Sequence, residues 1–493
     1  MKSLKKSLLS AAVVALSFGS VFSTSILAEE TTNEETTVEA KKEEKKEAPK
    51  KIEHVEQGKK PKNIIVLIAD GAGPAYTSAY RVFKNGKAGK DLPMTILDTF
   101  FVGQLMTHPF QEDPTVTDSA AAGTAMATGY KTMNGQIGMD SEGNEVDSIL
   151  DIAKQNGKAT GLIATSTITH ATPAAFGATV VDRDNEAGIA DNYFDDKIND
   201  EMKIDVLLGG GLKNFQRKDR DLTKEYVEAG FDFVQNKDEL AKSEKGQVLG
   251  LFAEEAMAPE IDRPENEPAL AEMTDAAIKK LSQDEDGFFL MVEGSQVDWA
   301  GHADDPVYAM NDMAAYEKAV EVALNFAKEN GDTLVISTVD HETGGLVIGQ
   351  DYMWDPTPIK QMKKTPAFIA KEMAETKDID GTVKKYIEFA LTADEKSDIE
   401  NALLPGGEGE EGIAKILANA VNTRSYTGWA AKGSHTAVDP NIYAYGPGYE
   451  RYQGVIDNTE FAKIMFEFFG GKVTEAKKAE ETTVEETAEE TKA

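Results

Sequence analysis

Short apolar runs alternate with helical patterns along most of this 493-residue chain, and this alternation constrains its fold more than any other feature. The runs lie at residues 63–69, 159–165, 288–293, 333–340 and 442–445. The helical patterns lie at residues 119–128, 146–155, 306–330 and 460–469. Strands that are apolar on both faces are typical of a mostly parallel sheet that helices cover on both sides. The sequence therefore predicts an α/β fold with such a sheet at its centre.

Acidic residues stand at the ends of three of these runs. Asp70 follows the first run, and Glu293 and Asp340 each close another. In open α/β sheets, ligands bind beyond the carboxyl ends of the strands. We therefore expect these three carboxylates to converge on one edge of the sheet.

Four of the six histidines are candidate ligands: His302 and His341 stand close to carboxylates after apolar runs, and His170 and His435 lie in the stretches HATPAAF and GSHTA. The chain has no cysteine, so a metal ion would have to be held by imidazole, carboxylate or hydroxyl groups. The other two, His54 and His108, are interpreted as solvent-facing or structural.

These residues can form three sets of metal ligands, two of which suit zinc and one of which suits magnesium. Two imidazoles and one carboxylate leave an open coordination position, which is typical of a catalytic zinc. That set consists of Asp298, His302 and His435. A second zinc could be held by Asp70, Asp340, His341 and the hydroxyl of Ser119. Hard oxygen ligands suit magnesium, and Asp70, Thr172 and Glu293 supply them. Taken singly, each residue also fits a turn or a strand cap.

Ser119 follows Asp118 and precedes a run of alanines and glycine within residues 116–125. This pattern predicts a helix that begins at Ser119, where free backbone N–H groups favour an anion. A serine at this position could also serve only as an N-cap. No histidine lies near it in sequence, so we expect activation by a metal rather than a Ser-His-Asp triad.

The first residues have the pattern of a secretory signal. Lys2, Lys5 and Lys6 precede an apolar stretch at residues 8–22, which gives way to polar sequence after residue 28. The alternative is a retained membrane anchor. The interpretation as a signal predicts a protein that is secreted and is either released or associated with the cell wall.

The remaining chain divides by composition. Residues 29–58 and 473–493 are rich in Glu, Lys and Thr and are predicted to be disordered spacers. Residues 59–472 form the predicted catalytic domain. Within it, residues 350–432 are rich in Lys, Glu and Ala and are predicted to be an inserted helical subdomain that acts as a lid or an interface element.

The formal net charge of −34 argues against binding to nucleic acid or to anionic membrane surfaces. After the N-terminal stretch, no apolar run approaches the ~20 residues that a membrane span requires. We therefore expect that the mature chain neither binds nucleic acid nor spans a membrane.

Residues 60–470 resemble the bacterial alkaline phosphatases. The motifs that carry the resemblance occur in the family's order and are VLIADGAG, TDSAAAGTA, HATPAAF, VEGSQVDWAGH, VDHETGG and GSHTA followed by YAYGPG. The resemblance implies hydrolysis of phosphate monoesters, with Ser119 as the nucleophile that becomes transiently phosphorylated. It also implies that Arg183 clamps the phosphate and that the protein is a homodimer.

The resemblance further implies two zinc ions (Zn²⁺) and one magnesium ion (Mg²⁺). It assigns the first zinc to Asp298, His302 and His435, the second to Asp70, Asp340 and His341, and magnesium to Asp70, Thr172 and Glu293. At two positions the family varies. The best-known enterobacterial form has aspartate where this chain has His170 and lysine where it has Trp299. We interpret both as residues that lie behind the ligands.

Two alternatives stay open at this point. One is a phosphodiesterase or a sulfatase-like hydrolase on the same scaffold. The other is a surface protein that binds phosphate or metal without catalysis. The complete ligand set and the serine favour the monoesterase.

Overall fold

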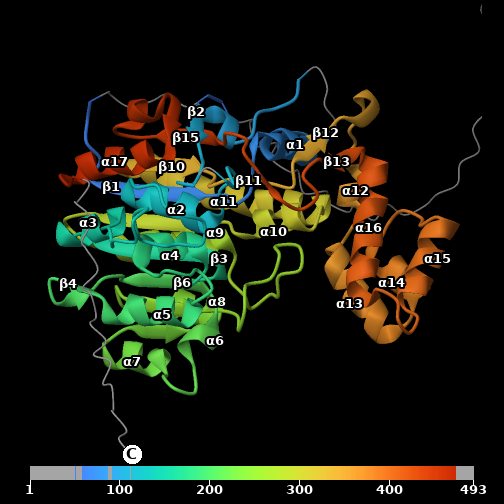
Figure 1. Cartoon of the computed structure of the whole chain (residues 1–493), viewed down its shortest axis with the longest axis horizontal. Helices are drawn as coiled ribbons and strands as arrows, with labels where there is room; N and C mark the ends of the chain where they lie inside the picture. The colour runs from blue at the N-terminus through green and yellow to red at the C-terminus, as the bar shows by residue number, and fades with distance from the viewer. Residues whose placement is uncertain (1–49, 52–57, 87–90, 112, 473–493) are drawn as a thin grey trace, which may run out of the picture. The chain divides into compact units, whose positions relative to one another are not determined.

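A ten-stranded sheet forms the centre of the protein (Figure 1). This computed structural model describes residues 50–51, 58–86, 91–111 and 113–472. Across the sheet the strands are β16 (Gly454–Asp457), β2 (Phe101–Met106), β15 (Asn441–Tyr445), β10 (Thr333–Thr338), β1 (Asn63–Ile68), β9 (Phe288–Glu293), β3 (Ala159–Thr167), β6 (Val206–Gly210), β8 (Val248–Leu251) and β7 (Asp232–Val234). Neighbouring strands are parallel except where β15 pairs with β10 and β2. The predicted mostly parallel sheet is therefore confirmed.

Strand β1 shows why the apolar runs are continuous. Ile65 and Leu67 belong to one hydrophobic cluster, and Ile64, Val66 and Ile68 belong to another. Side chains alternate between the two faces of a strand, so a strand covered on both sides must be apolar at every position.

Helices supply the other half of each cluster. One face packs against α1 (Pro74–Asn85), α9 (Leu270–Leu281) and α11 (Pro306–Asn330). The other face packs against α2 (Ser119–Thr128), α3 (Ile149–Gln155), α4 (Ala171–Gly177) and α17 (Asn458–Phe469). The helix predicted at residues 146–155 begins at Ile149, because Ser148 caps it and accepts a hydrogen bond from the Asp151 amide.

The predicted inserted subdomain is helical. It contains α12 (Thr357–Lys360), α13 (Pro366–Thr376), α14 (Ile379–Tyr386), α15 (Ala393–Ala402) and α16 (Gly409–Ser425). Helix α16 packs against α13 and also contacts α11. Buried side chains of α13 and α16, such as Ile369 and Leu417, continue the cluster on the α11 face.

Several predicted segments lie outside the described residues. These are the signal at residues 1–28, the tail at 473–493 and all of the spacer at 29–58 except residues 50, 51 and 58. In the part of the chain that is described, no helix combines the length and the apolar character that crossing a membrane requires.

Truncating the centre of the sheet should destabilise the protein strongly. Ile65 is fully buried in β1, so Ile65→Ala should lower the free energy of unfolding by about 2–5 kcal/mol, because it removes buried methyl groups and leaves a cavity. Urea unfolding measures this. The control is Val455→Ala in the edge strand β16, where the side chain is 58% exposed. Equal destabilisation by the two changes would contradict this account of the core.

Candidate metal centre

The three acidic residues at strand ends meet at one edge of the sheet. In the parallel ladder, Ile68 pairs with Thr338 of β10 on one side and with Glu293 of β9 on the other. Asp70 and Asp340 each lie two residues beyond the end of a strand, and Glu293 is the last residue of β9. All three side chains are buried. Parallel register therefore brings Asp70 together with two carboxylates that lie more than 200 residues further along the chain.

Ser119 reaches this edge from the start of α2. Asp118 is the N-cap, and its side chain accepts a hydrogen bond from the Ala121 amide, so the alternative in which Ser119 is only an N-cap is wrong. The small residues of α2 allow close packing, since a Cβ at Gly123 would lie 3.0 Å from that of Ala175 in α4. The Ser119 hydroxyl oxygen lies 3.0 Å from Nε2 of His341.

Helix α10 (Gln296–His302) carries Asp298 and His302 on one face, one helical turn apart. His302 Nε2 lies 3.3 Å from Asp298 Oδ2. The His302 side chain is 41% exposed, whereas that of Asp298 is 5% exposed. Asp298 therefore lies inside the centre, and His302 lies at its solvent edge.

His435 reaches the centre from a short ladder. Strand β11 (Glu342–Thr343) pairs with β14 (His435–Thr436), and this places His435 opposite Thr343. The His435 ring stacks on the His341 ring, with centroids 3.7 Å apart. His435 Nε2 lies 3.7 Å from Asp298 Oδ1 and 3.2 Å from His302 Nε2.

Backbone carbonyls fix which nitrogen each imidazole presents. His302 Nδ1 lies 2.6 Å from the Gly433 carbonyl, and His435 Nδ1 lies 2.9 Å from the Thr117 carbonyl. A carbonyl only accepts hydrogen bonds, so each Nδ1 carries a proton. In the neutral rings the two Nε2 lone pairs then face each other, and a cation between them would bind both.

The carboxylates carry shifted pKa values that reflect their crowding. Burial and the neighbouring carboxylates of Asp340 and Asp298 raise the pKa of Asp70 well above its usual range. Burial also raises the pKa of Glu293 to about 8. Burial acts on Asp298 in the same direction, but hydrogen bonding to His302 and the nearby imidazoles outweigh it and hold its pKa well below the usual range.

Several buried polar atoms at this edge have no hydrogen-bond partner among the described residues. They are both carboxylate oxygens of Asp70, Oε1 of Glu293, Oδ2 of Asp340, Oγ1 of Thr172 and Nδ1 of His170. Buried polar atoms are costly when unpaired. Oxygens and imidazole nitrogens of this kind are the ligands of divalent cations, so the residues fit a metal centre.

Three groups of side chains bring their ligand atoms within 4.8 Å of one another. The groups are Asp298, His341 and His435; then Asp70, Asp340 and His341; then Asp70, His170 and Glu293. The second group has the composition predicted from the sequence. The first contains His341, while His302 lies beside it. The third contains His170, which the sequence interpretation put behind the ligands, and Thr172 lies in the first turn of α4 just after it.

Arg183 lies beside the centre, next to Asp118 and His170. Its Nη1 donates a hydrogen bond to Asp118 Oδ2 at 3.0 Å, and its Nη2 lies 3.2 Å from His170 Nε2. Burial and the Arg183 guanidinium lower the pKa of His170 to about 4. The Trp299 ring meets the His170 ring edge-on, at 5.9 Å between centroids. Arg183 therefore connects Asp118, which directly precedes Ser119, with His170, whose other neighbours are Asp70 and Glu293.

Two residues with a part in this geometry were not predicted. Asp118 holds Arg183, and Thr343 hydrogen-bonds to Asp298 and lies beside His341. Both lie inside motifs that were noted, directly before Ser119 and two residues after His341. In the sequence, only their position next to predicted site residues could have indicated that Asp118 and Thr343 belong to this site.

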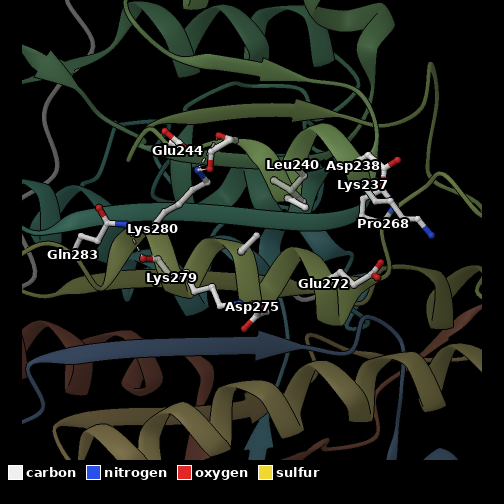
Figure 2. Close-up of a pocket in the computed structure, with 13 residues that line it drawn as sticks. Lys237, Asp238, Leu240, Glu244, Pro268, Glu272, Asp275, Lys279, Lys280 and Gln283 are labelled. Atoms are coloured by element: carbon white, nitrogen blue, oxygen red, sulfur yellow. Dashed lines mark hydrogen bonds and ion pairs between the residues drawn. The ribbon is translucent and has the colours of Figure 1, made fainter.

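Other features lie apart from the centre. His108 is about half exposed and lies 3.5 Å from Asp457, and His54 is outside the described residues. A cavity of about 590 Å³ opens between α8 (Lys237–Lys242) and α9 and shares no residue with the centre (Figure 2). The Lys280 ammonium in its wall already donates to the Ser243 and Lys245 carbonyls.

Comparisons with known proteins agree with the motifs. The family model for alkaline phosphatase matches residues 61–470. Alkaline phosphatase 3 of Bacillus subtilis (strain 168) is 50% identical over 412 residues, which cover 82% of this chain and 88% of that protein. The crystal structure of the cold-active alkaline phosphatase from the psychrophile Shewanella sp. is 35% identical, with a TM-score of 0.76, and the match covers 83% of this chain and 99% of that one.

A further solved structure is a histidine-to-glutamate variant of TAB5 alkaline phosphatase with magnesium bound. It is 31% identical, with a TM-score of 0.62, and the match covers 84% of this chain and 99% of that one. The resemblance and the enzyme class expected from the motifs are confirmed, and the enzyme hydrolyses phosphate monoesters. Since the family model spans most of the chain and the relatives match along nearly their whole length, this protein belongs to the alkaline phosphatase family.

Proposed function

We propose that this alkaline phosphatase works by transferring the phosphoryl group to Ser119, in a centre that holds two zinc ions and one magnesium ion. The observation that carries the proposal is the place of the Ser119 hydroxyl, at the start of α2 and 3.0 Å from His341 Nε2. The same nitrogen lies 3.2 Å from Asp340 Oδ2, a buried oxygen that has no hydrogen-bond partner among the described residues. A nucleophile surrounded by cation ligands is suited to attack a dianionic ester.

The ligands divide between the ions by chemistry. We assign one zinc to Asp298, His302 and His435, and the other to Asp70, Asp340, His341 and Ser119. We assign magnesium to Asp70, Thr172 and Glu293, whose oxygens suit that ion. The magnesium-bound TAB5 structure supports a magnesium site in this fold. His170 is a fourth candidate ligand there, because its imidazole lies within reach of Asp70 and Glu293.

The cations, when bound, would supply positive charge to the phosphate oxygens and lower the pKa of a hydroxyl or a water. The chain's own groups do the rest. Arg183 offers its guanidinium N–H groups to two phosphate oxygens, and Asp118 holds that side chain in place. Ser119 Oγ attacks phosphorus, the bond to the ester oxygen breaks and the alcohol leaves. Water then cleaves the phosphoserine and releases phosphate.

Location and assembly are also proposals. The basic and apolar pattern of residues 1–28 supports export, so we propose a secreted enzyme that is either released or held at the cell wall. We propose a homodimer because of the family resemblance. The acidic segments at 29–58 and 473–493 act as spacers in this proposal, and residues 350–432 as a lid or an interface element.

Removing the nucleophile tests the central step. Ser119→Ala should lower kcat for an aryl phosphate monoester by about three orders of magnitude or more, because no oxygen is left to accept the phosphoryl group. Zinc content, measured by elemental analysis, should show that metal is still bound. Ser282→Ala, at an exposed position after α9, is the control. Undiminished turnover by Ser119→Ala would refute the mechanism.

Arg183 should act mainly on phosphate binding. Arg183→Ala should raise KM and weaken inhibition by inorganic phosphate by about tenfold to a hundredfold, since two charged hydrogen bonds are lost. For Arg183→Lys, KM and the inhibition constant for phosphate should lie between those of the wild type and Arg183→Ala, because lysine keeps the charge but lacks the planar guanidinium group. Steady-state kinetics measure both. The control is Arg451→Ala, which breaks a surface pair with Glu467; an equal effect there would argue against the clamp.

Metal removal should make stability depend on pH. Burial raises the pKa of Glu293 from 4.5 to about 8, so the metal-free fold keeps this carboxyl protonated at low pH. The stability that the protonated Glu293 carboxyl contributes to the fold is fully present below about pH 4.5. It is lost as the pH rises through about 8. His170 and His435, whose pKa values burial lowers to about 4, act in the opposite direction in the lower part of this window, so the Glu293 contribution is read as the difference between wild type and Glu293→Gln. Relative to Glu293→Gln, the chelated wild type should lose on the order of 1 kcal/mol of stability per pH unit across this window.

Chemical denaturation of chelated and metal-loaded enzyme at several pH values measures this slope. Bound cations neutralise the carboxylates, so the loaded enzyme should show a much smaller slope. In chelated protein, Glu293→Gln removes the Glu293 contribution because the amide cannot ionise. A chelated wild type whose stability changes between pH 5 and pH 8 just as that of Glu293→Gln does would contradict the prediction.

A further inference from the structure

We propose that Thr343 is a positioning residue whose hydroxyl ties two of the metal subsites together; this inference rests on the proposed function. Thr343 lies in β11 and is fully buried. Its Oγ1 donates a hydrogen bond to Asp298 Oδ1 at 2.5 Å and lies 3.2 Å from His341 Nδ1. Asp298 and His341 are proposed ligands of different zinc ions.

The single proton of a hydroxyl decides the tautomer of His341. As a carboxylate, Asp298 only accepts, so the Thr343 proton is directed to it. Towards His341 the hydroxyl oxygen is then an acceptor, and Nδ1 of the ring must carry the proton. Nε2 then carries no proton, and its lone pair is available to a cation or to the Ser119 hydroxyl, which lies 3.0 Å away.

That lone pair is directed at the second subsite. His341 Nε2 lies 3.2 Å from Asp340 Oδ2 and 3.7 Å from Asp70 Oδ1. One hydroxyl therefore fixes the carboxylate of Asp298 at one subsite and the tautomer of His341 at the other. Partners behind metal ligands commonly change metal affinity by about 10- to 100-fold.

The surroundings of Thr343 hold its hydroxyl in this position. A Cβ at Gly71 would lie 3.0 Å from Thr343 Oγ1, and one at Gly301 would lie 3.0 Å from Thr343 Cβ. The Tyr76 hydroxyl donates to the Thr343 carbonyl at 2.6 Å. A valine has a similar outline, but it places a methyl group where the hydroxyl lies 2.5 Å from Asp298, so it removes the hydrogen bond and also crowds that carboxylate.

The test titrates metal-free enzyme with zinc in chelator-buffered solutions. Thr343→Val should weaken both zinc sites by about 10- to 100-fold, because ligands of both lose their orienting partner. Thr343→Ser restores the hydroxyl and should bind zinc close to the wild-type level. Thr343→Ala lacks the hydroxyl and adds no bulk, so it should weaken both sites as well, which separates the lost hydrogen bond from crowding by the valine methyl, and it replaces the valine variant if that one fails to fold. Thermal melts of the metal-free proteins separate lost affinity from lost folding.

Tyr76→Phe is the matched control, because it removes a hydrogen bond to the same residue but leaves the hydroxyl in place. It should lower thermal stability and leave zinc affinity unchanged. The inference is overturned if Thr343→Val binds both ions as tightly as the wild type, if it weakens one site alone, or if Tyr76→Phe weakens both equally. A wild type that binds no zinc would refute the proposed function itself, and this inference with it.

Discussion

Four buried carboxylates, those of Asp70, Glu293, Asp298 and Asp340, crowd one edge of the sheet, and the rest of the centre depends on how their charge is balanced. Burial and mutual repulsion raise the pKa values of Asp70 and Glu293, which means that the protein alone does not supply enough positive charge there. Divalent cations would supply it, and the same cations suit a dianionic substrate. One electrostatic requirement thus connects the fold to phosphate ester hydrolysis.

The sheet brings together side chains that no single segment of the chain could place close to one another. Parallel register aligns the ends of β1, β9 and β10, so the carboxylates face one space. Helix α2 positions Ser119 at this edge, α10 positions Asp298, and the β11–β14 ladder positions His435. Hydrogen bonds then orient each imidazole: the Gly433 and Thr117 carbonyls and, in our proposal, the Thr343 hydroxyl.

Much of this could be predicted because the signals are local. Residues 63–69 are apolar at every position, and they form β1 over Asn63–Ile68. Because ligands bind beyond the carboxyl ends of parallel strands, the sequence alone predicted that Asp70, Glu293 and Asp340 lie together. Helix starts were less certain, since the helix expected from residue 146 begins at Ile149, where the Ser148 cap decides it. His170 was expected behind the ligands; that its imidazole comes within ligand distance of Asp70 and Glu293 was not predicted, because it depends on how α4 packs against β9.

By itself, the sequence determined the sheet, the helices that cover it and the motifs that identify the family, because periodicity and residue type act over a few neighbouring positions. The tertiary structure alone decided which atoms face each other. The hydrogen bond from Thr343 to Asp298 spans 45 residues, and that from His435 to the Thr117 carbonyl spans 318. Such pairs carry no periodic signal, since they arise only after distant segments pack, and they set the tautomers and orientations that the chemistry requires.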